Sequence, residues 1–244
     1  CLDTTLSYVQ RVKKYVSRFV SFEDLGEGIF AADAVVNAIY EGASALPNVY
    51  TGKKYVCLRD EFLIAKANDF SEDVSRVLVM FGGTDPLNLS KRLYDIACKY
   101  NSEKINTEFD FILGSGYSHE SPLSNSRYGI TVVQDVARVT DYMKNADMAF
   151  SSQGRTTFEL ASMGVPTVVL AQNRREQLHP FAQMDNGFIN LGLGSEVSDE
   201  DILATLIWLI NSKSIRKEMH KLMLKNDLKS GIKRVKRILL GELE

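Results

Sequence analysis

The stretch DMAFSSQGRTTFELASMGVPTVVLAQN, residues 147–173, decides the fold class. It contains a short apolar run over 147–152, a helical pattern over 155–164 and a second apolar run over 165–171. Gly164 directly follows the helical pattern, and glycine is the residue that most often ends a helix. Two apolar strands joined by one helix make a βαβ unit, and such units build parallel sheets.

The alternation of strands and helices continues on both sides of this stretch. Further apolar runs predict strands at 18–24, 33–40, 76–82, 109–114, 130–136 and 188–194. Helical patterns are found at 4–15, 86–100, 139–146, 175–184 (interrupted near Pro180) and 199–211. We therefore expect an α/β protein whose C-terminal part is a Rossmann-type domain around a parallel sheet.

A polar segment, FSEDVS at residues 70–75, is the best candidate for a domain boundary. The sequence thus predicts a partial N-terminal α/β domain at 1–73 and a Rossmann-like domain at 74–228. The basic tail at 229–244 predicts a helix that packs back on the first domain with its charged face in solvent. A membrane-binding or calmodulin-type helix is the alternative for this tail.

Composition narrows the classes of function. The chain has 244 residues, 45% of them hydrophobic, and its 29 basic side chains nearly balance 31 acidic ones. We therefore expect no nucleic-acid partner and no membrane partner, and the sequence has neither a membrane-length apolar run nor a signal peptide. Cys1, Cys57 and Cys98 lie far apart with no CxxC pair, which predicts neither a disulfide framework nor a zinc cluster and favours a cytoplasmic location. We expect no metal and no cofactor.

The first candidate binding motif is FGGTD, residues 81–85, at the end of an expected strand. Gly82 and Gly83 let the main chain approach a ligand closely, and the following helix start favours an anion. Thr84 and Asp85 add oxygens that could bind a ligand or cap the helix. An ordinary capped turn between a strand and a helix explains the same residues.

The second candidate motif is SSQGRTT, residues 151–157, which again connects a strand to a helix. Hydroxyl groups and main-chain amides gather here at a helix N-terminus, a combination that can hold a diphosphate. Glu159 lies one turn further along, where a carboxylate could accept hydrogen bonds from a ribose diol. The alternative is a capping arrangement in which Glu159 interacts with the helix dipole.

The third candidate motif is AQNRREQLHPF, residues 171–181, after the strand VPTVVL. Asn173 and Gln177 are suited to hydrogen bonds with a sugar. His179 is either a general base or a surface and packing residue. The three motifs follow three separate strands, and ligands of open parallel sheets bind outside the carboxyl ends of the strands. We therefore expect all three turns to converge on one crevice.

These segments resemble a known family. Together, VLVMFGGTDP (77–86), residues 147–173 and NGFINLG (186–192) resemble the nucleotide-binding half of GT-B glycosyltransferase-like proteins. The resemblance is closest to the UDP-sugar hydrolases of pseudaminic-acid biosynthesis and their spore-coat polysaccharide relatives. Residues 21–42 resemble the end of the N-terminal domain in the same family. The family pattern G-x-x-Y-x-x-L-R-x-E-F is matched by Gly52, Tyr55, Leu58, Arg59, Glu61 and Phe62.

The resemblance implies a role for each matching residue. A nucleotide and its diphosphate would be bound by Gly82, Gly83, Thr84, Asp85, Ser152, Gln153, Gly154, Arg155, Thr156 and Glu159, with Glu159 at the ribose. The main chain near Val133 and Val136 would flank the base. Asn173 would be the catalytic asparagine near the sugar, with Gln177 and His179 close to it.

Two departures from the family pattern stand out. The usual Asn-Gln pair reads NRREQ at residues 173–177. Members of the family begin with a Gly-rich segment that carries the catalytic histidine. In this sequence His119, His179 and His220 all lie in other contexts. The resemblance thus implies an N-terminally truncated chain that lacks the catalytic histidine, so its own enzymatic activity stays an open question.

The expected function of the whole protein is binding and hydrolysis of a UDP-linked amino sugar in surface polysaccharide or sialic-acid-like sugar biosynthesis. One alternative is a GT-B glycosyltransferase. Another is a sugar epimerase on the same fold. The third is a non-catalytic nucleotide-sugar-binding module, fused to or associated with a cytidylyltransferase of the pathway.

Overall fold

The computed structural model describes residues 3–41, 46–103, 107–119, 123 and 129–242. The chain divides into two compact units. Unit 1 comprises Cys1–Arg59, His179–Phe181 and Asp227–Glu244, and unit 2 comprises Asp60–Leu178 and Ala182–Asn226. In the part of the chain that the structure describes, no helix has the length and apolar character needed to cross a membrane.

The division at Arg59/Asp60 differs from the expected boundary at residues 70–75. Residues 60–73 belong to unit 2 because their side chains and main chain hold them there. The Glu61 carboxylate accepts hydrogen bonds from the amide and the hydroxyl of Thr140, at 3.1 and 2.7 Å. The Asn68 main-chain amide donates to the carbonyl of Met163 at 2.9 Å. A polar composition alone therefore did not mark the boundary.

Unit 2 is built on a six-stranded, fully parallel sheet with the order β6-β5-β4-β7-β8-β9. Its strands are β4 (Arg76–Met80), β5 (Glu108–Leu113), β6 (Ile130–Gln134), β7 (Met148–Ser151), β8 (Thr167–Ala171) and β9 (Phe188–Leu193). All six coincide with apolar runs that predict strands. The four inner strands β5, β4, β7 and β8 are buried on both faces, which requires near-continuous apolar sequence and makes these runs easy to recognise.

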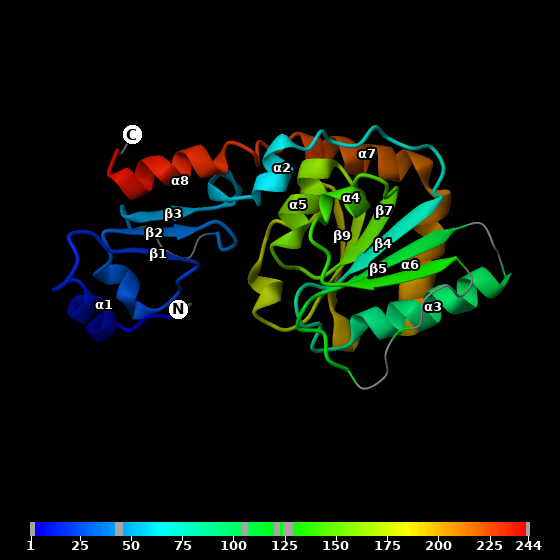
Figure 1. Cartoon of the computed structure of the whole chain (residues 1–244), viewed down its shortest axis with the longest axis horizontal. Coiled ribbons are helices and arrows are strands. Elements are labelled where there is room, and N and C mark those ends of the chain that lie inside the picture. Colours follow the sequence, from blue (N-terminus) through cyan, green and yellow to red (C-terminus); the bar gives the residue numbers. More distant parts are fainter. Residues whose placement is uncertain (1–2, 42–45, 104–106, 120–122, 124–128, 243–244) are drawn as a thin grey trace. The chain divides into compact units, whose positions relative to one another are not determined.

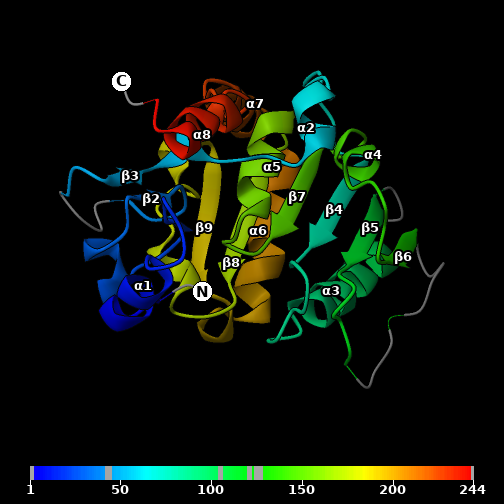
Figure 2. The same ribbon diagram turned by 60° about the vertical axis from the view of Figure 1, so that its left-hand side comes forward.

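The helices of unit 2 are α2 (Asp60–Ile64), α3 (Leu89–Glu103), α4 (Thr140–Met143), α5 (Thr156–Met163), α6 (Asp199–Asn211) and α7 (Lys213–Leu224). α3 and α6 contact each other on one face of the sheet, and α5 lies on the other face (Figures 1 and 2). Neither α2 nor α7 was predicted. The helix expected over 175–184 is instead two separate 3-10 turns, η3 (Glu176–Leu178) and η4 (Met184–Asn186).

The main hydrophobic core lies between the sheet and the pair α3 and α6. Val79, Phe111 and Phe150 of the strands pack with Leu93 of α3 and Leu206 of α6, and all five are almost completely buried. Burying such side chains stabilises a fold by roughly 1.5–3 kcal/mol each.

The strand order contains one reversal. From β4 the chain moves outward to β5 and β6, whereas β7, which pairs with the other side of β4, leads to β8 and β9. Loops that leave β4 and β7 therefore diverge and leave a crevice at the carboxyl ends of these strands, the usual ligand position in open α/β sheets.

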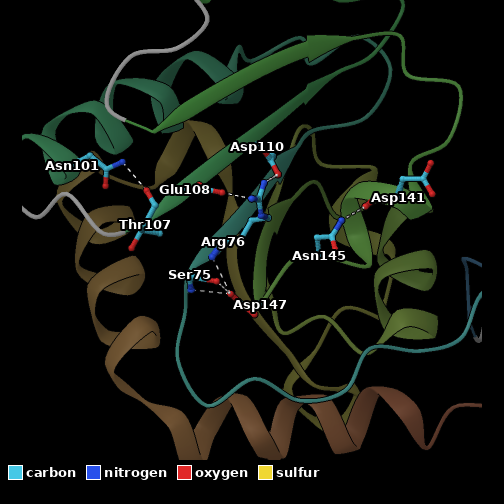
Figure 3. A network of polar contacts seen from close by, with 9 residues as sticks. All are labelled: Ser75, Arg76, Asn101, Thr107, Glu108, Asp110, Asp141, Asn145 and Asp147. Atoms are coloured by element: carbon cyan, nitrogen blue, oxygen red, sulfur yellow. Dashed lines mark hydrogen bonds and ion pairs between the residues drawn. The ribbon is translucent and has the colours of Figure 1, made fainter.

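The amino ends of the same strands carry a closed polar network (Figure 3). The Arg76 guanidinium donates to Asp110 at 2.8 Å and also pairs with Glu108. These carboxylates raise the pKa of Arg76. The Asp147 carboxylate accepts hydrogen bonds from the amide of Ser75 at 2.8 Å and from the amide of Arg76 at 2.9 Å. The network joins β4, β5 and the start of β7.

Unit 1 contains a smaller parallel sheet with the order β1-β2-β3. Its elements are α1 (Leu6–Val12), β1 (Val20–Phe22), η1 (Glu27–Phe30), β2 (Ala34–Asn37), β3 (Val49–Thr51), η2 (Lys53–Tyr55) and α8 (Gly231–Leu240). Val235 and Ile238 of α8 form a core with Ala34 and Val36 of β2. The short strand β3 was not predicted.

Candidate functional site

Three turns of unit 2 line one cavity of about 340 Å³. They follow β4, β7 and β8, so the cavity lies at the reversal of the strand order. The prediction that the three motifs converge is confirmed. The volume of the cavity falls in the range of small-molecule sites, roughly 300–1,000 Å³. The lining residues are Phe81, Gly82, Gly83, Thr84, Pro86, Ser152, Gly154, Arg155, Thr156, Gln172, Asn173 and Glu176.

In the first turn, Gly82 has a φ of 80°, which a residue with a side chain adopts only with strain. Asp85 does not line the cavity. Its carboxylate accepts hydrogen bonds from the amides of Leu89 and Ser90, at 2.9 and 2.8 Å, and from the Gln172 side chain at 2.6 Å. The buried Asp85 thus caps the start of α3, the alternative that the sequence left open, and its expected contact with a diphosphate stays a prediction.

The loop after β5, residues 114–116, packs against the main chain of the first turn. A Cβ atom on Gly114 would lie 2.4 Å from the carbonyl oxygen of Gly83 and 2.5 Å from that of Gly82. The Gly116 amide also donates to the carbonyl of Gly83 at 3.0 Å. Sequence reasoning missed this loop, although its GSG sequence at 114–116 directly follows an expected strand.

The second turn places the N-terminus of α5 at the cavity. The hydroxyl and the amide of Thr157 both donate to the carbonyl of Gly154, at 2.7 and 3.2 Å, which closes the turn. Arg155 is exposed at the lining, next to Thr156. A Cβ on Gly154 would meet no atom closer than 3.5 Å, so packing does not require glycine there. Glycine instead keeps the cavity open.

Ser152 and Gln153, also in the second turn, are both buried. Ser152 lines the cavity, whereas Gln153 does not. The amide of Gln153 donates a hydrogen bond to the carboxylate of Glu176 in the third turn. This contact joins the turns after β7 and β8.

Glu176 is the main polar group of the third turn. Its carboxylate also accepts a hydrogen bond from the Gln172 amide at 2.8 Å. Burial raises the pKa of Glu176, the charge of Asp85 raises it further, and the two amides oppose this shift. Asn173, the expected catalytic residue, lines the cavity, and its side-chain oxygen accepts a hydrogen bond from the Glu176 amide at 3.0 Å.

Gln172 connects the first and third turns. Its side-chain oxygen accepts a hydrogen bond from the Leu87 amide at 3.1 Å, and its side-chain nitrogen donates to Asp85. Neither Gln172 nor Glu176 was predicted as a site residue, although both stand in the polar run 171–181. The partners of the Gln172 side chain, Asp85 and Leu87, are distant in sequence, so only the structure could assign its role.

The other expected site residues lie outside the cavity lining. Glu159 is buried in α5, and Gln177 is exposed in η3. Val133 is in β6, and Val136 follows that strand; both are partly buried. His179 belongs to unit 1, where its ring contacts Tyr40 edge to face at 5.1 Å. The contacts that the resemblance implies for these residues stay predictions.

The remaining histidines and cysteines have no place in the cavity lining. His119 is 2.7 Å from the carbonyl oxygen of Asp85, and His220 is 2.7 Å from that of Gly164. Cys57 and Cys98 form no disulfide, and Cys1 lies outside the described residues. Across the described residues, no three His, Cys, Asp or Glu side chains come together in a way that could hold a metal ion.

The parallel sheets flanked by helices have the GT-B fold of glycosyltransferases. One match is the crystal structure of a mutant of S. aureus TarM in complex with fondaparinux, alpha-GlcNAc-glycerol and UDP. Its TM-score is 0.59 at 12% identity, and the match covers 88% of this chain and 44% of that one. No family model matches the chain.

Among curated proteins, the chain is similar to SpsG of Bacillus subtilis, a spore coat polysaccharide biosynthesis protein. The two are 26% identical over 217 residues, which cover 84% of this chain and 64% of SpsG. The chain is also 32% identical over 171 residues to MJ1062 of Methanocaldococcus jannaschii, an uncharacterised protein, covering 60% of this chain and 34% of MJ1062. The chain therefore spans about a third of one relative and under two thirds of the other.

Proposed function

We propose that the cavity of unit 2 binds the diphosphate of a nucleotide sugar, and that the whole protein transfers the sugar to a hydroxyl acceptor during polysaccharide synthesis. The observation that carries this proposal is the meeting of three turns and one helix N-terminus at the reversal of the strand order. In open α/β sheets this position is where nucleotides bind.

The lining chemistry supports a diphosphate. The N-terminus of α5 carries a partial positive charge, and the Arg155 guanidinium adds a full one beside it. Gly83 and Gly154 leave room for phosphate oxygens against the main chain, and the hydroxyls of Thr84, Ser152 and Thr156 can donate hydrogen bonds. Glu159 would reach the ribose from the next turn of α5.

Transfer is the reaction that the comparisons support better. The solved structures with this fold include named glycosyltransferases, and SpsG is named for polysaccharide biosynthesis. In transfer, the bond between the anomeric carbon and the diphosphate breaks, and the acceptor oxygen bonds to that carbon as it loses its proton. Hydrolysis of a UDP-linked amino sugar replaces the acceptor by water, and no observation favours it.

Direct binding measurements test the proposal. UDP, TDP, GDP and CMP are titrated calorimetrically into the chain and into Arg155→Ala. We expect at least one nucleoside diphosphate to bind, and Arg155→Ala to weaken it by roughly tenfold or more, as expected for a hydrogen bond to a charged group. Lys217→Ala is the matched control. It removes an exposed cation from α7, which contacts the opposite end of α5 through His220 and Gly164.

Two results would contradict the proposal. One is the absence of binding by all four nucleotides. The other is equal weakening by Arg155→Ala and Lys217→Ala, which would mean that binding responds only to the overall charge of the protein.

A further inference from the structure

A second concave site of about 500 Å³ lies in unit 2 between the edge strand β9 and helix α6. We call it the α6 groove, and it shares no lining residue with the cavity described above. Leu191, Val197 and Ala204 form its apolar lining together with Trp208, whose side chain is 47% exposed. The α6 groove is open to solvent and its lining is both polar and apolar, so the face of the exposed indole ring is accessible to a ligand.

Two carboxylates, Glu196 and Asp201, complete the α6 groove. Asp201 shares one face of α6 with Ala204 and Trp208, because the three are spaced by three and four residues. The Ser198 hydroxyl donates to the Asp201 carboxylate at 2.7 Å, which orients it. Glu196 is 3.4 Å from the guanidinium of Arg174, and both side chains are largely exposed.

The charge of the α6 groove defines its ligand. A carboxylate can accept about four hydrogen bonds, so both acids keep acceptor sites beyond these contacts. Two carboxylates beside an indole favour an ammonium group, which is attracted both to the charges and to the face of the ring. The apolar lining meanwhile suits the C–H face of a sugar ring.

We propose that the α6 groove binds a saccharide that carries a free ammonium group, such as a de-N-acetylated amino sugar in a glycan. Its ammonium lies between Glu196, Asp201 and the indole of Trp208, and its ring covers the apolar lining. This site is separate from the proposed nucleotide site, so either proposal can fail without the other.

Trp208 is the only tryptophan of the chain, so its fluorescence reports on this groove alone. The chain is titrated at low salt with a glucosamine hexasaccharide and with its fully N-acetylated counterpart. We expect a saturable change in Trp208 emission with the free amine, weakened by added salt, and no change with the acetylated sugar. Glu196→Gln and Asp201→Asn should each weaken binding by roughly two- to fivefold, the usual range for an exposed charge pair.

Glu218→Gln is the matched control, because it removes an exposed carboxylate of α7 and should leave the affinity unchanged. The Asp201 carboxylate also contacts Ser198 at the start of α6, so a thermal melt checks that Asp201→Asn leaves the fold intact. Glu196 lies outside α6, so Glu196→Gln does not affect this contact. Equal responses to both hexasaccharides would overturn the role of the ammonium. If spermine competed as strongly as the hexasaccharide, the site would bind amines in general and the saccharide part of the proposal would be wrong. If Trp208 emission did not respond at all, the proposed site would be wrong.

Discussion

The polar groups at the two ends of the unit 2 sheet differ in their surroundings. At the amino ends, Arg76, Asp110 and Asp147 satisfy one another and the main chain, so the network is closed (Figure 3). At the carboxyl ends, the exposed Arg155 faces a cavity beside glycines that packing does not require. A closed network stabilises the fold, whereas a cation and glycines that line a cavity are typical of binding.

The carboxyl end nevertheless has a closed network of its own beneath the cavity. The Gln172 side chain donates to Asp85, and the Glu176 carboxylate accepts from the main-chain amide of Gln172, while Asp85 also accepts from the amides of α3. These bonds hold the three turns in place. The useful division is therefore between residues that build the cavity and residues that are left facing into it. Substitutions should separate these two groups by their effects on stability and on binding.

The largest effect is expected from Gly114→Ala. The added Cβ would lie 2.4 and 2.5 Å from two main-chain carbonyl oxygens, which cannot move without displacing the first turn. We expect a loss of about 3 kcal/mol in the free energy of unfolding, the upper part of the range for overpacking, together with loss of nucleotide binding. Urea denaturation and calorimetry measure the two. Gly83→Ala is the control, since its Cβ meets no atom within 4 Å, and an equal loss of stability there would contradict this account.

A smaller effect is expected from Asp85→Ala, which removes the cap of α3 and a partner of Gln172. We expect the free energy of unfolding to fall by about 2 kcal/mol, the upper range for loss of a helix cap. Arg155→Ala should show the reverse pattern, with weaker nucleotide binding and little loss of stability. If Asp85→Ala weakened binding while its melting temperature stayed unchanged, Asp85 would be a ligand contact after all.

Much of this arrangement could be predicted from local sequence. The six strands of unit 2 and the position of the cavity follow from apolar runs and from the rule for parallel sheets. The division between building and facing residues could not be predicted. Asp85 and Gln172 are 87 residues apart, and no local pattern indicates that they bond.

The sequence did not predict helix α7, and the role of Glu159 stays a prediction, for different reasons. Helix α7 buries Arg216, Met219 and Met223, so its apolar stripe contains an arginine and is difficult to recognise. The Arg216 guanidinium donates instead to the carbonyls of Leu209 and Ile210 at the end of α6. The role expected for Glu159 depends on a bound ligand, which sequence and fold alone do not supply.

The smallest effect concerns the protonation of Glu176. Because burial raises its pKa in the folded state, the folded protein holds this proton more tightly than the unfolded chain does. Its contribution to stability is therefore fully present below pH 4.5, the ordinary pKa, and is lost as the pH rises through the raised value. Urea denaturation of the chain and of Glu176→Gln between about pH 4 and 8 should show the variant gaining relative stability as the pH increases.

Nucleotide binding should extend this effect. A diphosphate beside Glu176 adds negative charge and raises the pKa of the carboxyl further, so binding should take up protons at pH values around the raised pKa. Calorimetry in buffers with different ionisation enthalpies measures this uptake, and Glu176→Gln should reduce it. The control is Glu218→Gln on α7, whose proton uptake should equal that of the unmodified chain. Equal uptake by the Glu176 variant and the unmodified chain would place the diphosphate away from the third turn and would leave Glu176 with a purely structural role.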